Sequence, residues 1–264
     1  MSDTTATLAY MAKLPLYETE KPYTIIPSAE REDIADGDRS NVEVDSHENI
    51  NITDIRPWMS DCKGYKKETA ELLEKHFGAE RVITWDLRKR NVVTYEKGTQ
   101  WDYNDQRQTD GPAIMAHVDF TYESGIMVVG AYLTAEEKTK YLNGHYRIRL
   151  VNTWRPMVPV VEHQPLAFCD PRSVLPEQLV ACDRVMCDQL GEVYLLSYHP
   201  ENKWYWLSKQ TPSEPYLLVS WDSDSCGEAR YCPHLSFTNK LAPADAPPRE
   251  SVETRSIVIT RKED

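Results

Sequence analysis

The stretch HVDFTYESG, residues 117–125, places a histidine two residues before an aspartate inside an apolar run. Alternate residues of a β-strand project to the same side, so the side chains of His117 and Asp119 would point together if this stretch is a strand. An imidazole and a carboxylate are two of the three ligands of a facial triad, which leaves three positions of an octahedral Fe(II) ion open. The spacing therefore predicts part of a non-haem iron site.

A third ligand has to come from a distant strand. His234, in RYCPHLSF, is the best candidate because it lies late in the strand order. Other histidines are weaker because they fall in an acidic loop, the last turn of a helix or a proline-flanked turn: His47, His76 and His163. Two more lie at the ends of expected strands, and the pattern leaves them open: His145 and His199.

A second group of candidate binding residues follows a proline-rich loop, LAPADAPPR, at the start of the last expected strand. Arg249 and Ser251 would share a face of that strand, and Arg255 lies further along the same face. A guanidinium can hold a carboxylate through two hydrogen bonds, and a hydroxyl adds one more donor. A dicarboxylate such as 2-oxoglutarate needs such a site at the end that does not chelate the metal. A surface arginine paired with Glu250 or Glu253 is the plainer reading.

Composition excludes several classes of partner. The net charge of −12 would repel a polyanion, so we expect neither nucleic acid nor an anionic membrane surface as a partner. The N-terminus has no basic segment followed by an apolar one, and no apolar run approaches the roughly 20 residues that span a bilayer. The six cysteines form no Cys-x-x-Cys pair and fit neither a zinc site nor a disulfide scaffold, although Cys226 and Cys232 could close a loop. These features predict a cytoplasmic protein.

The elements that would position these residues are mostly strands. Nine short β-branched or aromatic runs are broken by turn residues: RVITWDL, NVVTYE, GPAIMAHVDF, GIMVVGAYL, HYRIRLVNTW, EVYLLSYH, KWYWLSK, PYLLVSWDS and SVETRSIVIT. Two helices are expected, over 61–78 with Asp61 as N-cap and Gly78 as C-cap, and from the Thr134–Glu137 capping box to Asn143-Gly144. This pattern predicts a mainly β fold with flanking helices, and a double-stranded β-helix (jelly roll) encloses a pocket best.

We expect one domain over residues 1–264. Residues 1–45 would form an irregular, extended N-terminal arm with a solvated acidic loop around 29–49, and 46–264 a jelly-roll core with outer helices. The arm could serve an interface, which leaves a homodimer open.

Three longer blocks carry a resemblance. HVDFTYESG, NTWRPMVPVVEHQPLAFCDPRSV (152–174) and CPHLSF with LAPADAPPRESVETRSIVI are similar to the fungal and bacterial hydroxylase/desaturase family, which includes gibberellin desaturase-like proteins and the cephamycin methoxylation component. The resemblance covers nearly the whole chain from about Leu8. It implies a jelly-roll oxygenase of specialised metabolism that uses Fe(II), 2-oxoglutarate and O2 on a small-molecule substrate.

The resemblance also implies roles for single residues. The family's iron ligands fall on His117, Asp119 and His234, and its 2-oxoglutarate arginine falls on Arg249, although the gap from His234 to Arg249 is longer than in many related oxygenases. Four residues would serve the substrate pocket. Arg155 and Arg172, within the NTWRP and DPRS blocks, could anchor a substrate carboxylate or pair with Glu162 or Asp170, whereas Tyr122 and Trp154 could line the pocket or simply pack in the core.

Other functions remain as alternatives. One is a cupin-type dioxygenase without 2-oxoglutarate, which would leave Arg249 and Ser251 without a dicarboxylate to hold. Another is a non-catalytic jelly-roll protein that binds a small molecule. A hydrolase is disfavoured because the chain has no Gly-x-Ser-x-Gly elbow. The sequence distinguishes neither the substrate nor hydroxylation from desaturation or oxidative ring closure.

Overall fold

The fold is built from two β-sheets. The computed structural model describes residues 4–25, 39–54, 69–92, 109–185, 190–224 and 230–262. The larger sheet has nine strands in the order β1 (Thr4–Met11), β3 (Val44–Asp54), β11 (Trp204–Trp206), β8 (Leu166–Cys169), β13 (His234–Ser236), β6 (His117–Val118), β10 (Leu190–Leu196), β9 (Leu179–Val185) and β2 (Tyr23–Ile25). The smaller sheet has the order β12 (Tyr216–Asp222), β7 (Tyr146–Pro156), β14 (Glu250–Arg261), β4 (Arg81–Asn91) and β5 (Thr109–Asp110).

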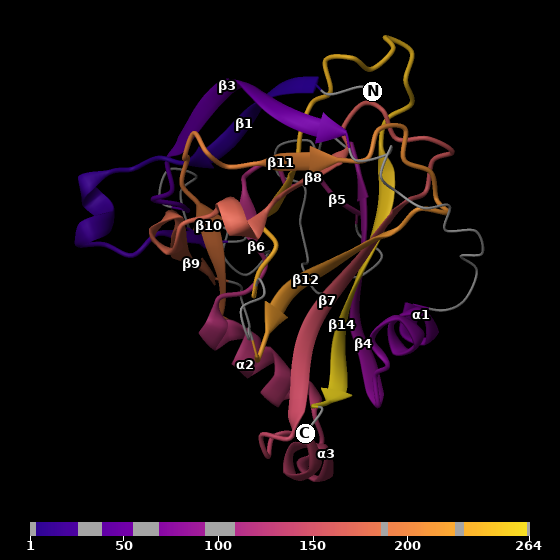
Figure 1. The fold of residues 1–264 in the computed structure, drawn as a ribbon. Helices are drawn as coiled ribbons and strands as arrows, with labels where there is room; N and C mark the ends of the chain where they lie inside the picture. The colour runs from indigo at the N-terminus through magenta and orange to yellow at the C-terminus, as the bar shows by residue number, and fades with distance from the viewer. Residues whose placement is uncertain are drawn as a thin grey trace.

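In the described residues, three α-helices and three short 3-10 helices accompany the sheets. They are α1 (Thr69–Phe77), α2 (Tyr122–Tyr132), α3 (Ala135–Tyr141), η1 (Pro15–Glu18), η5 (Pro171–Ser173) and η6 (Pro176–Gln178). In Figure 1, α1 lies beside β4 on one side of the five-stranded sheet, while α2 and α3 lie at the end near the C-terminus. This is the mainly β arrangement with flanking helices that the sequence predicts.

The long central strands β7 and β14 give the five-stranded sheet two different faces. Residues 251, 253, 255, 257 and 259 of β14 share one face, because side chains alternate along a strand. This inner face changes character along its length, from polar Ser251, Glu253 and Arg255 to apolar Ile257 and Ile259.

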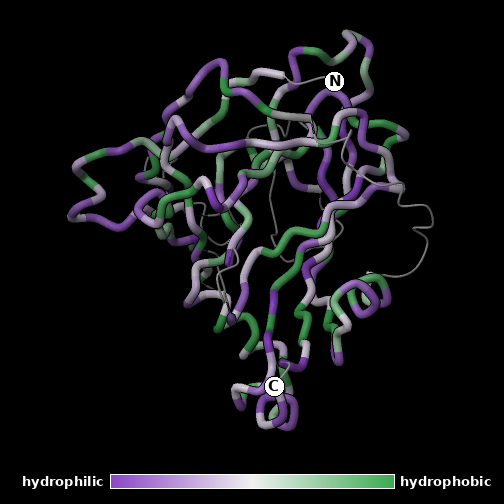
Figure 2. Tube along the Cα trace, viewed as in Figure 1, coloured by the Kyte–Doolittle hydropathy of each residue, from purple (hydrophilic) through white to green (hydrophobic). Residues whose placement is uncertain are grey.

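Helix α1 covers the opposite, outer face of this sheet. Its Leu73 packs with Val82, Val151 and Val258 of the three central strands. Figure 2 shows the helix hydrophobic on the side toward the sheet and hydrophilic on the far side. The predicted C-cap is present, since Gly78 has a φ of 59°, a conformation that glycine adopts at little cost. The predicted N-cap Asp61 lies outside the described residues.

Helix α2 corrects one prediction, because GIMVVGAYL was expected to be a strand. The helix begins at a capping box in which Thr121 and Ser124 bond to each other's backbone amides. Val129 of the helix and Leu133, its C-cap, pack on Ile257 and on other apolar side chains of the inner face. A short apolar run has no clear period, so strand and helix could not be told apart there. The second capping box, Thr134 with Glu137, starts α3 as predicted.

The N-terminal region is more regular than expected. The arm forms strand β1, which pairs with β3, and β3 includes residues 44–49 of the predicted acidic loop. The structure also shows strands that the sequence pattern did not indicate, among them β8 and β9. No helix among the described residues is long and apolar enough to cross a membrane.

Candidate metal centre

Two histidines meet on the inner face of the nine-stranded sheet. Strand β13 pairs with β6 in a register that sets His234 directly beside His117. Their ring centroids lie 4.4 Å apart. His234 is buried, and the side chain of His117 is 15% exposed. The long chain between the two residues therefore returns to place both imidazoles side by side.

Asp119 completes the cluster from just beyond the end of β6. The strand stops at Val118 and the backbone bends at Asp119, so the expected longer strand is not present. The carboxylate nevertheless points to the histidines, with Asp119 Oδ1 3.5 Å from His117 Nε2. One ligand atom from each of His117, Asp119 and His234 lies within 4.8 Å of the others, and no second group of three His, Cys, Asp or Glu ligands was found among the described residues.

Backbone carbonyls orient both imidazoles. His117 Nδ1 lies 2.7 Å from the carbonyl oxygen of Met115, and His234 Nδ1 lies 3.0 Å from that of Cys232. A carbonyl only accepts hydrogen bonds, so each Nδ1 carries the proton and donates it. Each Nε2 is then left with a lone pair for a metal ion, as is common for histidine ligands.

Electrostatics favour the metal-binding forms of these groups. Burial, together with the adjacent His117, lowers the pKa of the His234 imidazole and keeps it neutral near pH 7. Burial alone would raise the pKa of the Asp119 carboxyl, but the charge of the Arg255 guanidinium holds that pKa well below its usual range. Two histidines and one carboxylate form a donor set that suits Fe(II) with open coordination positions.

The five-stranded sheet holds the other oxygen of Asp119. Asn152 Nδ2 donates to Asp119 Oδ2 and, at 2.8 Å, to Glu253 Oε1. Arg255 Nε lies 3.4 Å from the same Asp119 oxygen. Because Oδ2 is engaged in this way, Oδ1 is the oxygen that faces the histidines.

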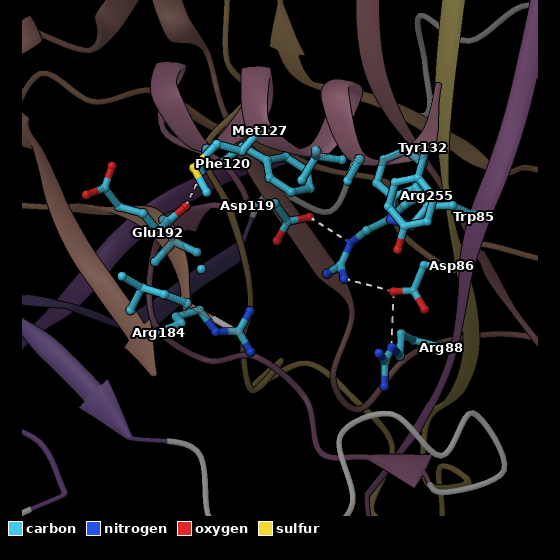
Figure 3. A pocket seen from close by; sticks show the side chains of 16 residues that line it. Trp85, Asp86, Arg88, Asp119, Phe120, Met127, Tyr132, Arg184, Glu192 and Arg255 are labelled. Carbon is cyan, nitrogen blue, oxygen red and sulfur yellow. Dashed lines mark hydrogen bonds and ion pairs between the residues drawn. The ribbon is translucent and has the colours of Figure 1, made fainter. Parts of the chain in front are cut away.

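A row of buried ion pairs continues from Asp119 across the sheet. Arg255 NH1 lies 3.0 Å from Asp86 Oδ2, and Arg88 Nε lies 3.1 Å from the same oxygen. Figure 3 shows this row of alternating acids and arginines along one wall of a cavity. All four of these side chains are less than 10% exposed, so each charge depends on its neighbours for compensation.

Two cavities meet at the cluster. One, of about 460 Å³, lies between Asp119 and helix α2, and another, of about 340 Å³, reaches His117. Both are lined by Asp119, Arg184, Val193 and Arg255. The candidate metal centre is therefore open to small molecules on two sides.

Arg249 and Ser251 form a second polar group at the buried end of the same sheet. Both are 1% exposed. Arg249 NH1 donates to the carbonyl oxygen of Gln164 at 3.2 Å and to Ser236 Oγ at 3.0 Å, while Arg249 Nε and Ser251 Oγ have no hydrogen-bond partner. Burial and nearby Arg90 lower the pKa of the Arg249 guanidinium to about 9, so it is still charged near neutral pH. A buried cation with unused donors is suited to an anionic ligand.

The other predicted site residues lie elsewhere or have different partners. Arg255, a second candidate for 2-oxoglutarate, is already bound to Asp86 and Asp119. Arg172 is 86% exposed and pairs with Asp170, and Arg155 is exposed on β7, outside both cavities. As substrate anchors, both arginines stay predictions. Pairing of Arg172 with Asp170 was the plainer alternative at the sequence level.

The two aromatic candidates also fall outside the two cavities. Trp154 is buried in an apolar cluster with Tyr216 and lies under the Arg249 guanidinium, 5.7 Å from ring centroid to Cζ. Tyr122 is 37% exposed and stacks on Trp221, with ring centroids 5.8 Å apart. Core packing therefore accounts for Trp154, and Tyr122 belongs to the surface near the start of α2.

Sequence reasoning missed the supporting residues Asn152, Glu253, Asp86, Arg88 and Arg184. One signal was available, because Glu253 lies between Ser251 and Arg255 on the same strand face. No such signal existed for Asn152 or Asp86, since their roles depend on the pairing of β7 and β4 with β14.

Comparisons with known proteins agree with this geometry. A family model described as an oxidoreductase/YMDC permease-like domain matches residues 17–259. The hydroxylase/desaturase efuI of Hormonema carpetanum is 32% identical over 212 residues, which cover 74% of this chain and 69% of that protein. The alpha-ketoglutarate-dependent dioxygenase tstK of Talaromyces stipitatus is 32% identical over 203 residues, with 74% and 69% covered.

The fold has a match among solved structures. A structure of the iron and alpha-ketoglutarate-dependent endoperoxidase NvfI superposes with a TM-score of 0.80 over 99% of each chain, at 22% sequence identity. This agreement confirms the predicted jelly-roll fold.

Proposed function

We propose the function of this chain from one premise: it belongs to the hydroxylase/desaturase family of Fe(II)/2-oxoglutarate-dependent oxygenases. The function is the oxidation of a small molecule of specialised metabolism, with 2-oxoglutarate as co-substrate and O2 as oxidant. The observation that carries the proposal is the convergence of three ligand atoms, from His117, Asp119 and His234, within 4.8 Å.

The residues around these atoms fit a ferrous ion. Both Nε2 atoms and Asp119 Oδ1 face one volume, and each ligand is fixed from behind by a carbonyl, an amide or a guanidinium. Such outer partners set the orientation and basicity of metal ligands. Three protein ligands leave room for a bidentate co-substrate and O2 on an octahedral ion.

Arg249 and Ser251 would hold the far carboxylate of 2-oxoglutarate. In the described part of the chain, Arg249 contacts a carbonyl and a hydroxyl but forms no ion pair, unlike Arg255 and Arg88. A carboxylate could accept from Arg249 Nε and Ser251 Oγ, the two donors that lack partners. In a dioxygenase that works without a dicarboxylate, both buried donors would stay without a hydrogen-bond acceptor.

With iron and 2-oxoglutarate bound, the centre supplies a strong oxidant for hydroxylation, desaturation or ring closure. The protein's own residues would then aim one C–H bond at the metal and exclude water from it. The apolar side chains Phe120, Val128 and Val193 line the cavity next to Asp119 and suit both tasks.

A reducing compartment suits this chemistry. The cysteines that the structure describes, Cys169, Cys182 and Cys232, are free thiols, and burial raises the pKa of each. We therefore propose that the protein works in the cytoplasm. Cys226, the suggested partner of Cys232, lies outside the described residues, and a homodimer stays a prediction.

The iron site is tested by anaerobic titration of the purified protein with Fe(II) and 2-oxoglutarate. We expect a weak visible charge-transfer band, and succinate release once O2 is admitted. His117→Ala should abolish both, because it removes one of three ligands. His145→Ala is the matched control, since His145 is exposed and lies outside the cluster. A band that survives His117→Ala would contradict the assignment.

The co-substrate site is tested at Arg249. Losing a charge-assisted hydrogen bond costs about 1.5–3 kcal/mol, so Arg249→Met should raise the dissociation constant of 2-oxoglutarate by roughly 10- to 100-fold. Fe(II) affinity measured without 2-oxoglutarate should change little. An unchanged dissociation constant for 2-oxoglutarate would place the co-substrate elsewhere. Circular dichroism should show that the variant is folded, because Arg249 is buried and its replacement could disturb the fold.

A further inference from the structure

One face of helix α2 forms a wall of the larger cavity. The helix residues that line the cavity recur every three or four positions: Ser124, Met127, Val128, Ala131 and Tyr132. Residues with this spacing share one face of an α-helix. Another face carries Gly125 and Val129, which pack against Trp221 on the apolar half of the sheet. Helix α2 therefore covers the sheet with one face and shapes the cavity with the other.

Aromatic and aliphatic side chains extend this wall into a broad apolar surface. The Trp85 ring stacks on Tyr132 with centroids 5.4 Å apart, and its centroid lies 6.4 Å from that of Phe120. Met127 and Leu190 line the same cavity and are 65% and 61% exposed, which places them at its rim. A volume of about 460 Å³ is in the range of pockets for small organic molecules. The cavity is therefore suited to an apolar ring system.

The charged side chains that line this cavity balance one another. The described lining holds three carboxylates and three guanidiniums: Asp86, Asp119, Glu192, Arg88, Arg184 and Arg255. Arg255 contacts both Asp86 and Asp119, and Arg88 Nε lies 3.1 Å from Asp86 Oδ2. Glu192 is bound by Lys21 and accepts a hydrogen bond from Thr121. Arg184 interacts with a neighbouring group as well. Each of the six charges is therefore already engaged within the protein.

The hydroxyl groups of the α2 wall are engaged too. Ser124 Oγ donates to the carbonyl oxygen of Glu192 at 2.7 Å and accepts from the Thr121 amide at 2.9 Å, and Tyr132 also has an interaction partner. A charged ligand would have to displace one of these partners or stay buried without a counter-charge, and both are costly. An uncharged ligand meets neither cost, so the described lining favours neutral molecules over anions and cations alike.

We propose that the substrate is an uncharged, largely apolar ring compound. Its ring system lies against Trp85, Phe120 and the cavity-facing residues Val128 and Ala131 of helix α2. Because Asp119 lines the same cavity as these four residues, this placement brings the substrate to the metal centre. The inference rests on the proposed function only for the word substrate, since the apolar surface itself consists of residues that are not proposed metal ligands.

Three matched fluorescent probes test this preference. 1-Pyrenebutanol, 1-pyrenebutyrate and 1-pyrenebutylamine share one apolar ring system and one chain length, and at neutral pH they are uncharged, anionic and cationic. Their dissociation constants are measured by pyrene fluorescence under anaerobic conditions, with the protein loaded with Fe(II) and saturating 2-oxoglutarate so that the acid does not occupy the co-substrate site. We expect the alcohol to bind about tenfold or more tightly than either charged probe, because a buried charge without a partner is costly.

Two lysine substitutions on α2 locate the preference in this cavity. Ala131→Lys adds a cation to the balanced lining and should tighten the acid relative to the alcohol by about tenfold. Ile126→Lys is the matched control, since Ile126 is 50% exposed on the same helix and does not line the cavity, and it should leave every ratio within about twofold of the parent value. A charged probe that binds the parent protein as tightly as the alcohol, no binding of any probe, or parent-like ratios in Ala131→Lys would each overturn the proposal.

Two further measurements separate this inference from the proposed function. Trp85→Leu should weaken all three probes by a similar factor, because it shortens the aromatic wall and leaves the charges unchanged. A parent protein that binds Fe(II) and 2-oxoglutarate but prefers a charged probe would overturn the inference while leaving the oxygenase intact. Conversely, a parent protein that binds no Fe(II) yet still prefers the alcohol would refute the proposed function and leave the binding site standing.

Discussion

The two halves of the inner face of β14 are equally buried but chemically opposite. Ser251, Glu253 and Arg255 form the polar half, next to the candidate metal centre, and Ile257 and Ile259 form the apolar half, under helix α2. Both halves belong to one continuous strand with the same alternation of side chains. The difference therefore comes from what each half faces and not from its backbone.

The comparison shows two ways of stabilising a buried surface. The apolar half gains from any well-packed neighbour, because the hydrophobic effect is non-directional. The polar half is stable only while each charge keeps its partners, since an unpaired buried charge is costly. A metal centre needs the second kind of surface, because ligands must be held in one orientation.

The largest expected effect comes from breaking the polar half at Arg255. Arg255→Met leaves Asp86, Asp119 and Glu253 without their shared cation and should lower the free energy of unfolding of the metal-free protein by about 3–5 kcal/mol. Added Mn(II) should recover part of this loss, because a divalent cation compensates Asp119. Urea unfolding with and without metal measures both values.

The matched change in the apolar half is Ile257→Val. It removes one methyl group from the cluster under α2 and should cost about 0.5–1.5 kcal/mol, with or without metal. A similar dependence on metal in both variants would show that the two halves do not act separately.

A smaller effect is expected at Asn152, which supports the metal ligand without carrying a charge. Asn152→Leu removes the amide that holds Asp119 Oδ2 and Glu253 Oε1, and it should lower metal affinity about 10- to 100-fold. Isothermal titration calorimetry with the metal ion measures this change in affinity. Leu150→Met, two residues earlier on the same face of β7, should leave the affinity unchanged. Equal losses in both variants would mean that general packing, and not the amide, sets the affinity.

The sequence predicted the parts of this site that depend on local spacing. His117, Asp119 and His234 were chosen correctly as a cluster, and the strands that became β7, β12 and β14 were recognised from their β-branched and aromatic residues. Strand alternation also placed Arg255 on the inner face. These features follow from a period of two residues, which a single segment displays.

The rest depends on strand pairing, which spacing alone does not reveal. Arg255 was a second candidate for 2-oxoglutarate, but the register of β14 with β4 sets it opposite Asp86. Arg184 was not considered, because only the pairing of β9 with β10 brings it to the cavity. Helix α2 was read as a strand because its apolar residues lack a clear period, although Thr121 and Ser124 mark its start.

Another small effect is expected in helix α2, which covers the apolar half. A Cβ atom added at Gly125 would overlap the indole ring of Trp221, whose Nε1 donates to the carbonyl oxygen of Tyr122. Overpacking of this kind costs about 1–3 kcal/mol, whereas alanine in place of glycine gains about 1 kcal/mol of helix propensity. Gly125→Ala should therefore lower the free energy of unfolding by up to about 2 kcal/mol, independently of metal.

Gly130→Ala in the same helix separates the two contributions. No heavy atom lies within 4 Å of a Cβ added there, so only the gain in helix propensity remains and the variant should be more stable by about 0.5–1 kcal/mol. Urea unfolding of both variants checks the opposite signs. If Gly125→Ala were also stabilising, α2 would have room to move on Trp221, and the apolar half would be less tightly packed than the polar half beside it.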